Sequence, residues 1–251
     1  MKLSVCVDAL FAGQDFLPHL PAIKAAGVDA IEFWCWWDKD NLVEIKAQCD
    51  ALGIEIIAVC MKFISLCDAS LRAAFLCALE ETLAVCKRLG VTKLITQVGD
   101  DTLAPREVQI EAICTTLREA VPLLSAAGVT IVLEPLNMTV DHPGYFLSRA
   151  EDAFFIIKKV DSPFVKVVFD IYHQQITEGN LTSAIRENIS SIAHFHGAGV
   201  PGRHELDTGE VSYAGVCREI DALFYEGYLG LEYFPLDDPL VGIQNAIKSL
   251  S

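Results

Sequence analysis

The 251-residue sequence predicts a single-domain α/β protein, residues 1–251, folded as a (β/α)₈ (TIM) barrel. Eight short apolar runs alternate with amphipathic segments, and this number of units in a chain of this length is typical of the barrel. Hydrophobic residues make up 52% of the chain, which favours a parallel sheet buried on both faces. A doubly wound sheet is the alternative, but no glycine-rich phosphate loop follows the first apolar run.

The predicted elements follow one another at regular intervals. The apolar runs start near Lys2, Ala30, Ile56, Lys93, Val129, Val165, Ile192 and Gly230. Hydrophobic periodicity predicts helices between most of them, over residues 17–26, 42–52, 71–89, 106–126, 150–159 and 213–225. Several helices end close to a glycine, which adopts left-handed backbone readily, and the candidate C-caps are Gly27, Gly53, Gly90, Gly128 and Gly227.

Composition excludes several classes of protein. The net charge is −15, from 19 Lys+Arg against 34 Asp+Glu, which argues against a nucleic-acid partner because phosphates require a positive field. No apolar run approaches the ~18 residues of a membrane span, and the N-terminus lacks the long apolar stretch of a signal peptide. The nine cysteines are scattered without a CxxC pair, which argues against a disulfide framework or a thiolate zinc site. We therefore expect a cytoplasmic protein without a membrane partner.

Each of the last four predicted strands ends in a side chain that can bind a cation. These residues are Glu134, Asp170, His196 and Glu232. One acidic residue at a strand end is more often solvated or capping, but four successive strand ends are far more informative, because active sites of this barrel form there. Three carboxylates and one imidazole suit a divalent metal ion such as Mn²⁺, Mg²⁺, Co²⁺ or Zn²⁺. Acids on adjacent strands would also repel one another without a cation.

The stretch around the seventh predicted strand contains further polar residues. A glycine-rich loop, residues 197–202, follows the strand and brings Arg203 back toward its end. His194 lies two residues before His196 and therefore also points into the barrel, where we expect a hydrogen-bonded interior histidine rather than a ligand. Glu32 alternates with apolar neighbours and also faces the interior, without an assigned role.

Seven segments from the fifth strand onward form a specific combination. They read EPLN (134–137), PGYF (143–146), FDIYHQQ (169–175), EGNL (178–181), HFHGAGVPGRHE (194–205), GE (209–210) and EYFP (232–235). Together they resemble the hydroxypyruvate isomerases of the xylose isomerase-like barrel superfamily, whose relatives include the ketose 3-epimerases. The resemblance extends over nearly the whole chain.

The resemblance implies a metal-dependent isomerase of the aldose–ketose type. The reaction it implies converts hydroxypyruvate to tartronate semialdehyde, or isomerises a related small 2-oxo or hydroxy acid, by enediolate proton transfer. It implies that Glu134 and Glu232 are the catalytic acid–base pair as well as metal ligands, and it assigns His173 and Arg203 to substrate binding. Leu206 is a departure, because relatives often have proline after RHE.

Other polar and aromatic residues have two interpretations each. Lys62 follows the third strand and is a candidate for holding an anionic substrate, against the default of a solvated lysine. Asn137 would bind substrate or orient Glu134, and a role in a turn is equally plausible. His142 would cover the site or be an ordinary loop histidine. Three tryptophans after the second strand would line the pocket or form a contact in a homo-oligomer: Trp34, Trp36 and Trp37.

Four alternatives to the small-acid isomerase stay open. A ketose 3-epimerase would use the same metal and glutamates on a neutral sugar. An endonuclease for abasic DNA would need more metal ligands and a basic groove, against which the net charge of −15 argues. A non-catalytic metal- or sugar-binding barrel and an inosose dehydratase-like lyase are the others. In each case but the endonuclease the partner is a small molecule.

Overall fold

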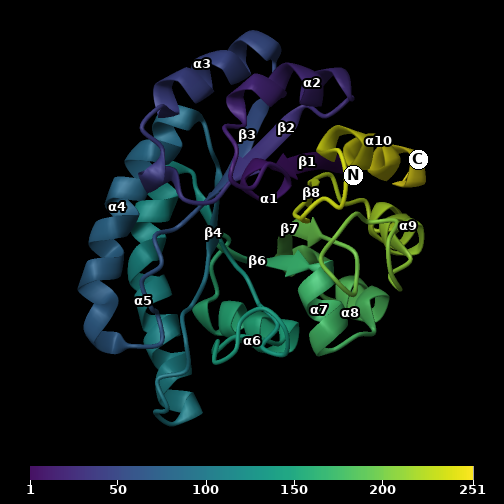
Figure 1. The fold of residues 1–251 in the computed structure, drawn as a ribbon. Helices are drawn as coiled ribbons and strands as arrows, with labels where there is room; N and C mark the ends of the chain where they lie inside the picture. Colours follow the sequence, from purple (N-terminus) through teal and green to yellow (C-terminus); the bar gives the residue numbers. More distant parts are fainter. Residues whose placement is uncertain (251) are drawn as a thin grey trace.

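The strands close into a parallel barrel with helices around its outside (Figure 1). The computed structural model describes residues 1–250. Each strand pairs with the next along the chain, and β8 pairs with β1, which confirms the predicted (β/α)₈ barrel. The strands are β1 (Lys2–Cys6), β2 (Ala30–Phe33), β3 (Glu55–Cys60), β4 (Lys93–Thr96), β5 (Thr130–Leu133), β6 (Val165–Asp170), β7 (Ile192–Gly197) and β8 (Tyr228–Leu231).

The helices agree with the predicted segments in most places. The α-helices are α1 (Val7–Leu10), α2 (Leu20–Ala25), α3 (Leu42–Leu52), α4 (Arg72–Leu89), α5 (Arg106–Ala127), α6 (Ala150–Val160), α7 (Ile171–Thr177), α8 (Leu181–Asn188), α9 (Tyr213–Ala222) and α10 (Pro239–Leu250). Short 3₁₀ turns are η1 (Leu17–His19), η2 (Trp36–Asp38), η3 (Ala69–Leu71) and η4 (Ile189–Ser191). Figure 1 shows both chain termini near α10.

Glycine ends three of the predicted helices in left-handed backbone. Gly53, Gly90 and Gly128 are the C-caps of α3, α4 and α5, with φ of 64°, 76° and 66°. The same prediction is wrong for Gly227, because α9 ends at Ala222 and the cap there is Leu223.

The sheet register brings the polar strand ends together. Asp170, the last residue of β6, is paired with His196 of β7, and His196 is paired with Gly230 of β8. Glu134 and Glu232 directly follow β5 and β8. Because the strands are parallel and closed, all four side chains reach the same end of the barrel.

Alternation along the strands separates two apolar clusters. In β5, Ile131 and Leu133 belong to the large cluster between strands and helices, whereas Val132 belongs to a small cluster inside the barrel. The interior is therefore packed below the polar strand ends, which leaves the carboxyl end of the strands for a ligand. Within residues 1–250, no helix combines the length and apolar character needed to traverse a bilayer.

Candidate functional site

The structure brings the four predicted metal ligands together at the carboxyl end of the barrel. Glu134, Asp170, His196 and Glu232 each offer one ligand atom, and these atoms all lie within 4.8 Å of one another. The four residues are between 1% and 5% exposed. His196 Nδ1 lies 2.9 Å from Glu134 Oε1 and 3.6 Å from Glu232 Oε2. The imidazole nitrogen thus faces two carboxylates at once.

Burial and mutual repulsion set the protonation of this cluster. Burial and the Glu232 carboxylate raise the pKa of Asp170 to about 7. Burial also opposes ionisation of Glu134, but the hydrogen bond from His196 and its charge outweigh this effect and lower the Glu134 pKa. Burial lowers the pKa of His196, but the charges of Glu232 and Glu32 outweigh it, so the pKa lies well above its usual value. The cluster therefore carries excess negative charge that protons or a cation must offset.

The donor set fits a divalent cation. Three carboxylates and one imidazole are hard or borderline donors, which match Mg²⁺, Mn²⁺, Co²⁺ or Zn²⁺. The ligand atoms are close enough to share one ion, and they are withdrawn from water, so a cation would replace the protons that now relieve their repulsion. Glu134, Asp170, His196 and Glu232 are the residues that would hold it.

Arg203 lies over the cluster and contacts Glu232. One of its terminal nitrogens, Nη2, donates to Glu232 Oε2 at 2.6 Å, and the other, Nη1, lies 3.8 Å from Asp141 Oδ1. The guanidinium centre lies 5.2 Å from the ring centre of Tyr172 and 5.8 Å from that of Phe234. The two aromatic rings hold the planar group in place, and the fork can bind a carboxylate with both terminal nitrogens.

The loop that carries Arg203 is attached to the segment after β8. The Phe234 amide donates to the Arg203 carbonyl at 2.8 Å, and His204 Nδ1 contacts the Phe234 carbonyl at 2.7 Å. The Leu236 amide donates to Glu205 Oε1 at 3.0 Å. These bonds tie the arginine loop to Phe234 and Leu236, which lie two and four residues after Glu232.

His173 is a neutral hydrogen-bond donor directed at the cluster. Its Nδ1 accepts from the Asn137 amide at 3.1 Å and lies 2.7 Å from Asn137 Nδ2. A ring nitrogen that accepts from a backbone amide carries no proton, so the proton is on Nε2. Nε2 lies 3.6 Å from Asp170 Oδ2 and has no hydrogen-bond partner among the described residues. Burial and the Arg203 charge lower the His173 pKa well below its usual value.

Asn137 organises the loop after β5 rather than lining the cavity. Its Oδ1 accepts from the amides of Val140 and Asp141, and its Nδ2 donates to Asp141 Oδ2 at 2.6 Å. The side chain is fully buried. Of the roles predicted for Asn137, the structure shows the turn, and it adds the orientation of His173.

Lys62 forms an ion pair with Glu81 of α4. Its Nζ is 2.6 Å from Glu81 Oε2 and 5.2 Å from the ring centre of Trp36. Lys62 is not among the residues that line the cavity described below. Its charge is thus offset by Glu81, and the role of Lys62 in holding an anionic substrate stays a prediction.

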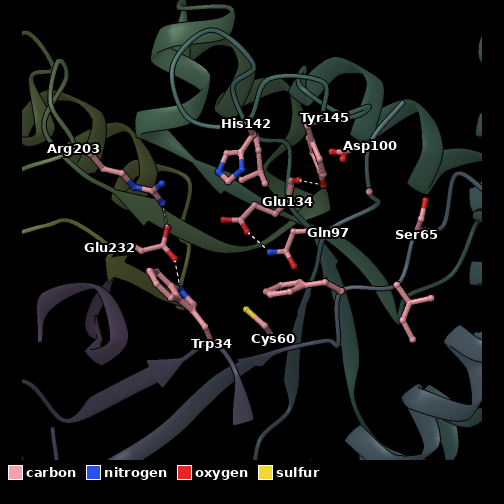
Figure 2. A pocket seen from close by; sticks show the side chains of 14 residues that line it. Trp34, Cys60, Ser65, Gln97, Asp100, Glu134, His142, Tyr145, Arg203 and Glu232 are labelled. Carbon is pink, nitrogen blue, oxygen red and sulfur yellow. Dashed lines mark hydrogen bonds and ion pairs between the residues drawn. The ribbon is translucent and has the colours of Figure 1, made fainter. Parts of the chain in front are cut away.

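A cavity of about 530 Å³ opens beside the cluster. In Figure 2, Arg203, Glu232 and Trp34 lie at one end, Glu134, Gln97 and His142 at its middle, and Ser65 and Asp100 at the other end. His142, which we expected either to cover the site or to be an ordinary loop residue, lines the cavity.

Two residues that orient the glutamates were not predicted as site residues in these roles. Trp34 Nε1 donates to Glu232 Oε1 at 2.8 Å, and Gln97 Nε2 donates to Glu134 Oε2 at 2.9 Å (Figure 2). No role is predicted for Gln97 from the sequence, and for Trp34 only a pocket wall or a subunit contact is predicted. Both directly follow a strand, β2 and β4. A search of the predicted strand ends for neutral hydrogen-bond donors, and not only for cation ligands, would identify both residues from the sequence.

The other tryptophans lie at the rim. Trp37 packs edge-on against Trp36, with ring centres 5.8 Å apart, and against Phe63, with ring centres 5.3 Å apart. Phe63 lines the cavity and is 63% exposed. This places an aromatic edge at the mouth of the cavity.

Comparison with known proteins identifies the family. The model of the xylose isomerase-like TIM barrel family matches residues 20–250. A 2-oxo-tetronate isomerase of Cupriavidus necator is 46% identical over 111 residues, a match that covers 44% of this chain and 42% of the relative. The hydroxypyruvate isomerase of Escherichia coli is 27% identical over 260 residues, with 97% of each chain covered.

A solved structure agrees in fold over the same length. A protein from Brucella melitensis described as an AP endonuclease, family 2, superposes with a TM-score of 0.91 at 26% identity, covering 97% of both chains. The barrel, the ligand cluster and the family match agree with one another. The chain therefore belongs to the xylose isomerase-like TIM barrel family, in which it groups with the hydroxypyruvate and 2-oxo-tetronate isomerases and is an isomerase.

Proposed function

We propose that this isomerase interconverts hydroxypyruvate and tartronate semialdehyde, or a closely related small 2-oxo acid, with a divalent cation held by Glu134, Asp170, His196 and Glu232. The observation that carries the proposal is the convergence of this buried ligand set with Arg203 beside one cavity, which Glu134, Glu232 and Arg203 line. A cation held by the four ligands would bind the hydroxyl and carbonyl oxygens of the substrate. The Arg203 guanidinium would bind the substrate carboxylate, the group that distinguishes an acid from a neutral sugar.

The reaction moves two hydrogens between neighbouring positions of the substrate. The carbon that bears the hydroxyl loses a proton and the carbonyl carbon gains one, while the hydroxyl proton passes to the former carbonyl oxygen. A bound divalent cation would act as a Lewis acid that stabilises the negative charge developing on these two oxygens. The proposed acid–base groups are Glu134 and Glu232, of which one removes the carbon-bound proton and the other returns it.

The surroundings of Glu134 and Glu232 support their proposed roles as acid–base groups. Each carboxylate receives a hydrogen bond from a neutral donor, Gln97 for Glu134 and Trp34 for Glu232, which fixes its orientation without removing its charge. His173 Nε2–H is free to donate to a substrate oxygen. Arg203, which contacts Glu232 in the structure, would bind the substrate carboxylate.

Variants of the two glutamates test the proposal. We expect Glu134→Gln and Glu232→Gln each to lower kcat by ~10²–10⁴ at saturating metal, since each removes a general acid–base group. The matched control is Glu55→Gln, because Glu55 starts β3 at the opposite end of the barrel, where it accepts from Tyr228. Wild-type turnover in either site variant, with metal content verified, would refute the assignment.

Isotope exchange separates the proposal from its rivals. In deuterated water the wild type should introduce deuterium at the carbon that accepts the proton in hydroxypyruvate. A barrel that only binds metal or sugar would give no exchange, and a ketose 3-epimerase would exchange at C3 of a ketose instead. The net charge of −15 and the acidic ligand cluster do not provide the positive field that an endonuclease needs.

A four-carbon 2-oxo acid is the second candidate substrate. The cavity extends past the ligand cluster to Ser65 and Asp100, which can hydrogen-bond to hydroxyl groups beyond the reacting carbons (Figure 2). The local match of 46% to a 2-oxo-tetronate isomerase supports the same candidate. Comparing kcat/KM for hydroxypyruvate and 2-oxo-tetronate in wild type and in Asp100→Ala distinguishes them: if the four-carbon acid is the better substrate, the variant should lose activity mainly on it.

A further inference from the structure

A second polar cluster lies inside the barrel beneath the proposed metal site. Glu32 of β2 and His194 and His196 of β7 are each at most 1% exposed. Glu32 Oε2 lies 2.8 Å from His194 Nε2 and 3.3 Å from His196 Nε2. The proposed reaction uses neither Glu32 nor His194, although a buried carboxylate is unfavourable unless its environment compensates for lost water.

The barrel is shaped to hold this carboxylate. Ser4 of β1 donates its hydroxyl to Glu32 Oε1 at 3.0 Å, so both carboxylate oxygens have donors. Gly230 of β8 leaves room on the remaining side: a Cβ there would lie 2.7 Å from His196 Cδ2 and even closer to Glu32 Oε1. Residues from β1, β7 and β8 therefore combine to fix the carboxylate of β2 beside Nε2 of His196.

The contact with Glu32 determines which nitrogen of His196 is available above it. An ionised carboxylate only accepts hydrogen bonds, so His196 must present Nε2–H to Glu32. In a neutral ring, the lone pair is then on Nδ1, which is the nitrogen that faces Glu134 and Glu232. An unprotonated His196 Nδ1 and the Glu134 carboxylate oxygen 2.9 Å away are both acceptors. Two acceptors at this distance require a proton or a cation between them.

We propose that Glu32, held by Ser4 and His194, is a positioning residue that fixes the orientation and the Nε2–H tautomer of His196 so that Nδ1 can bind the cation. This inference rests on the proposed metal site. A carboxylate behind a ligating histidine also strengthens the ligand, and mutations of such partners typically lower metal affinity 10–100-fold.

Metal affinity measured by calorimetry tests the role of Glu32. For Mn²⁺ titrated into chelator-treated, then desalted protein, we expect one site per chain, and a 10–100-fold higher Kd in Glu32→Leu, which has no acceptor. Glu32→Gln keeps a carbonyl acceptor for His196 and should restore part of the affinity, which a purely space-filling role would not explain. Glu55→Leu is the matched control at the other end of the barrel and should bind Mn²⁺ as the wild type does. Thermal unfolding without metal verifies that each variant is folded.

Nitrogen NMR of the wild type tests the tautomer without any mutation. In the Zn²⁺-loaded protein, ¹⁵N shifts should show His196 with a protonated Nε2 and a metal-bound Nδ1. A ring bound through Nε2, an unchanged Kd in folded Glu32→Leu, or a second Mn²⁺ per chain at the Glu32 cluster would each overturn the inference and leave the proposed function standing. A wild type that binds no divalent cation would overturn both.

Discussion

Replacing Asp170 by asparagine should make the cation-free protein more stable at neutral pH, although it removes a proposed metal ligand. Burial and the Glu232 charge raise the pKa of Asp170 from 3.8 to about 7. The folded state thus binds a proton that the unfolded chain releases above about pH 4, so the free energy of unfolding falls as pH rises. The fall ends near pH 7, where the folded state also loses the proton.

The size of the effect follows from the same values. Each pH unit well inside this window corresponds to about 1.4 kcal/mol and the slope halves at the folded-state pKa, so the wild type should lose ~2 kcal/mol between pH 5 and pH 7 relative to the variant. Asparagine keeps the structural role, because Asp170 Oδ1 caps α7 by accepting from the amides of Tyr172 and His173, and an amide oxygen can accept the same bonds.

Urea unfolding in a chelating buffer at a series of pH values measures this difference. The free energy of unfolding of Asp170→Asn should increase steadily relative to that of the wild type from pH 5 to pH 7. The same difference should stay constant for Asp40→Asn, an exposed control. Adding Mn²⁺ should reverse the order at neutral pH, because binding stabilises the wild type in proportion to ligand concentration over Kd. Parallel stability curves for the wild type and Asp170→Asn would show that Asp170 is not held neutral by the fold, and would refute the reasoning.

Three further predictions concern ligand binding and the cation. Arg203→Lys keeps the charge but loses the planar fork, so KM for a 2-oxo acid should rise about tenfold while metal affinity changes little, as steady-state kinetics and calorimetry would show; an unchanged KM contradicts carboxylate binding by Arg203. Asn137→Leu removes the side-chain acceptor of the Val140 and Asp141 amides and one of the two Asn137 contacts to His173 Nδ1, so it should lower the free energy of unfolding by about 1–3 kcal/mol and reduce kcat/KM, and wild-type values for both would contradict the orienting role. Metal affinity should rise with pH through neutrality, up to tenfold per pH unit for each proton released, because Asp170, with a pKa of about 7, and His196, with a pKa well above its usual value, must both lose a proton to bind the cation; a flat calorimetric profile would exclude both as ligands.

The barrel could be predicted because its signals are local. Each strand is a short apolar run, and glycines such as Gly53 and Gly90 end the preceding helices in a backbone conformation that other residues avoid. The predicted helix boundaries are wrong where tertiary contacts determine where a helix begins or ends. The helix predicted over 213–225 ends at Ala222, and α7 begins directly after Asp170 without a loop, because the carboxylate caps it.

The ligand cluster was accessible to sequence reasoning for a similar reason. In a parallel barrel the position after each strand points to a common end, so Glu134 and Glu232 could be placed beside each other without coordinates. The partners of these residues depend on distances across the barrel. Alternation in β2 and β7 indicates that Glu32 and His194 face inward, but only the closed sheet shows that they meet at 2.8 Å. The pairing of Lys62 with Glu81 likewise depends on packing between a loop and α4.

The attachment of the arginine loop to the segment after β8 has a consequence for how activity responds to mutation. Arg203 and Glu232 are joined by a direct ion pair, and the segments that carry them are joined by a backbone hydrogen bond from Phe234 to Arg203. A displacement that moves the anion-binding group therefore also moves a proton-transfer group. Substitutions in residues 198–205 should consequently change substrate affinity and turnover in concert, so this protein cannot readily evolve a new substrate preference through that loop without also altering its rate.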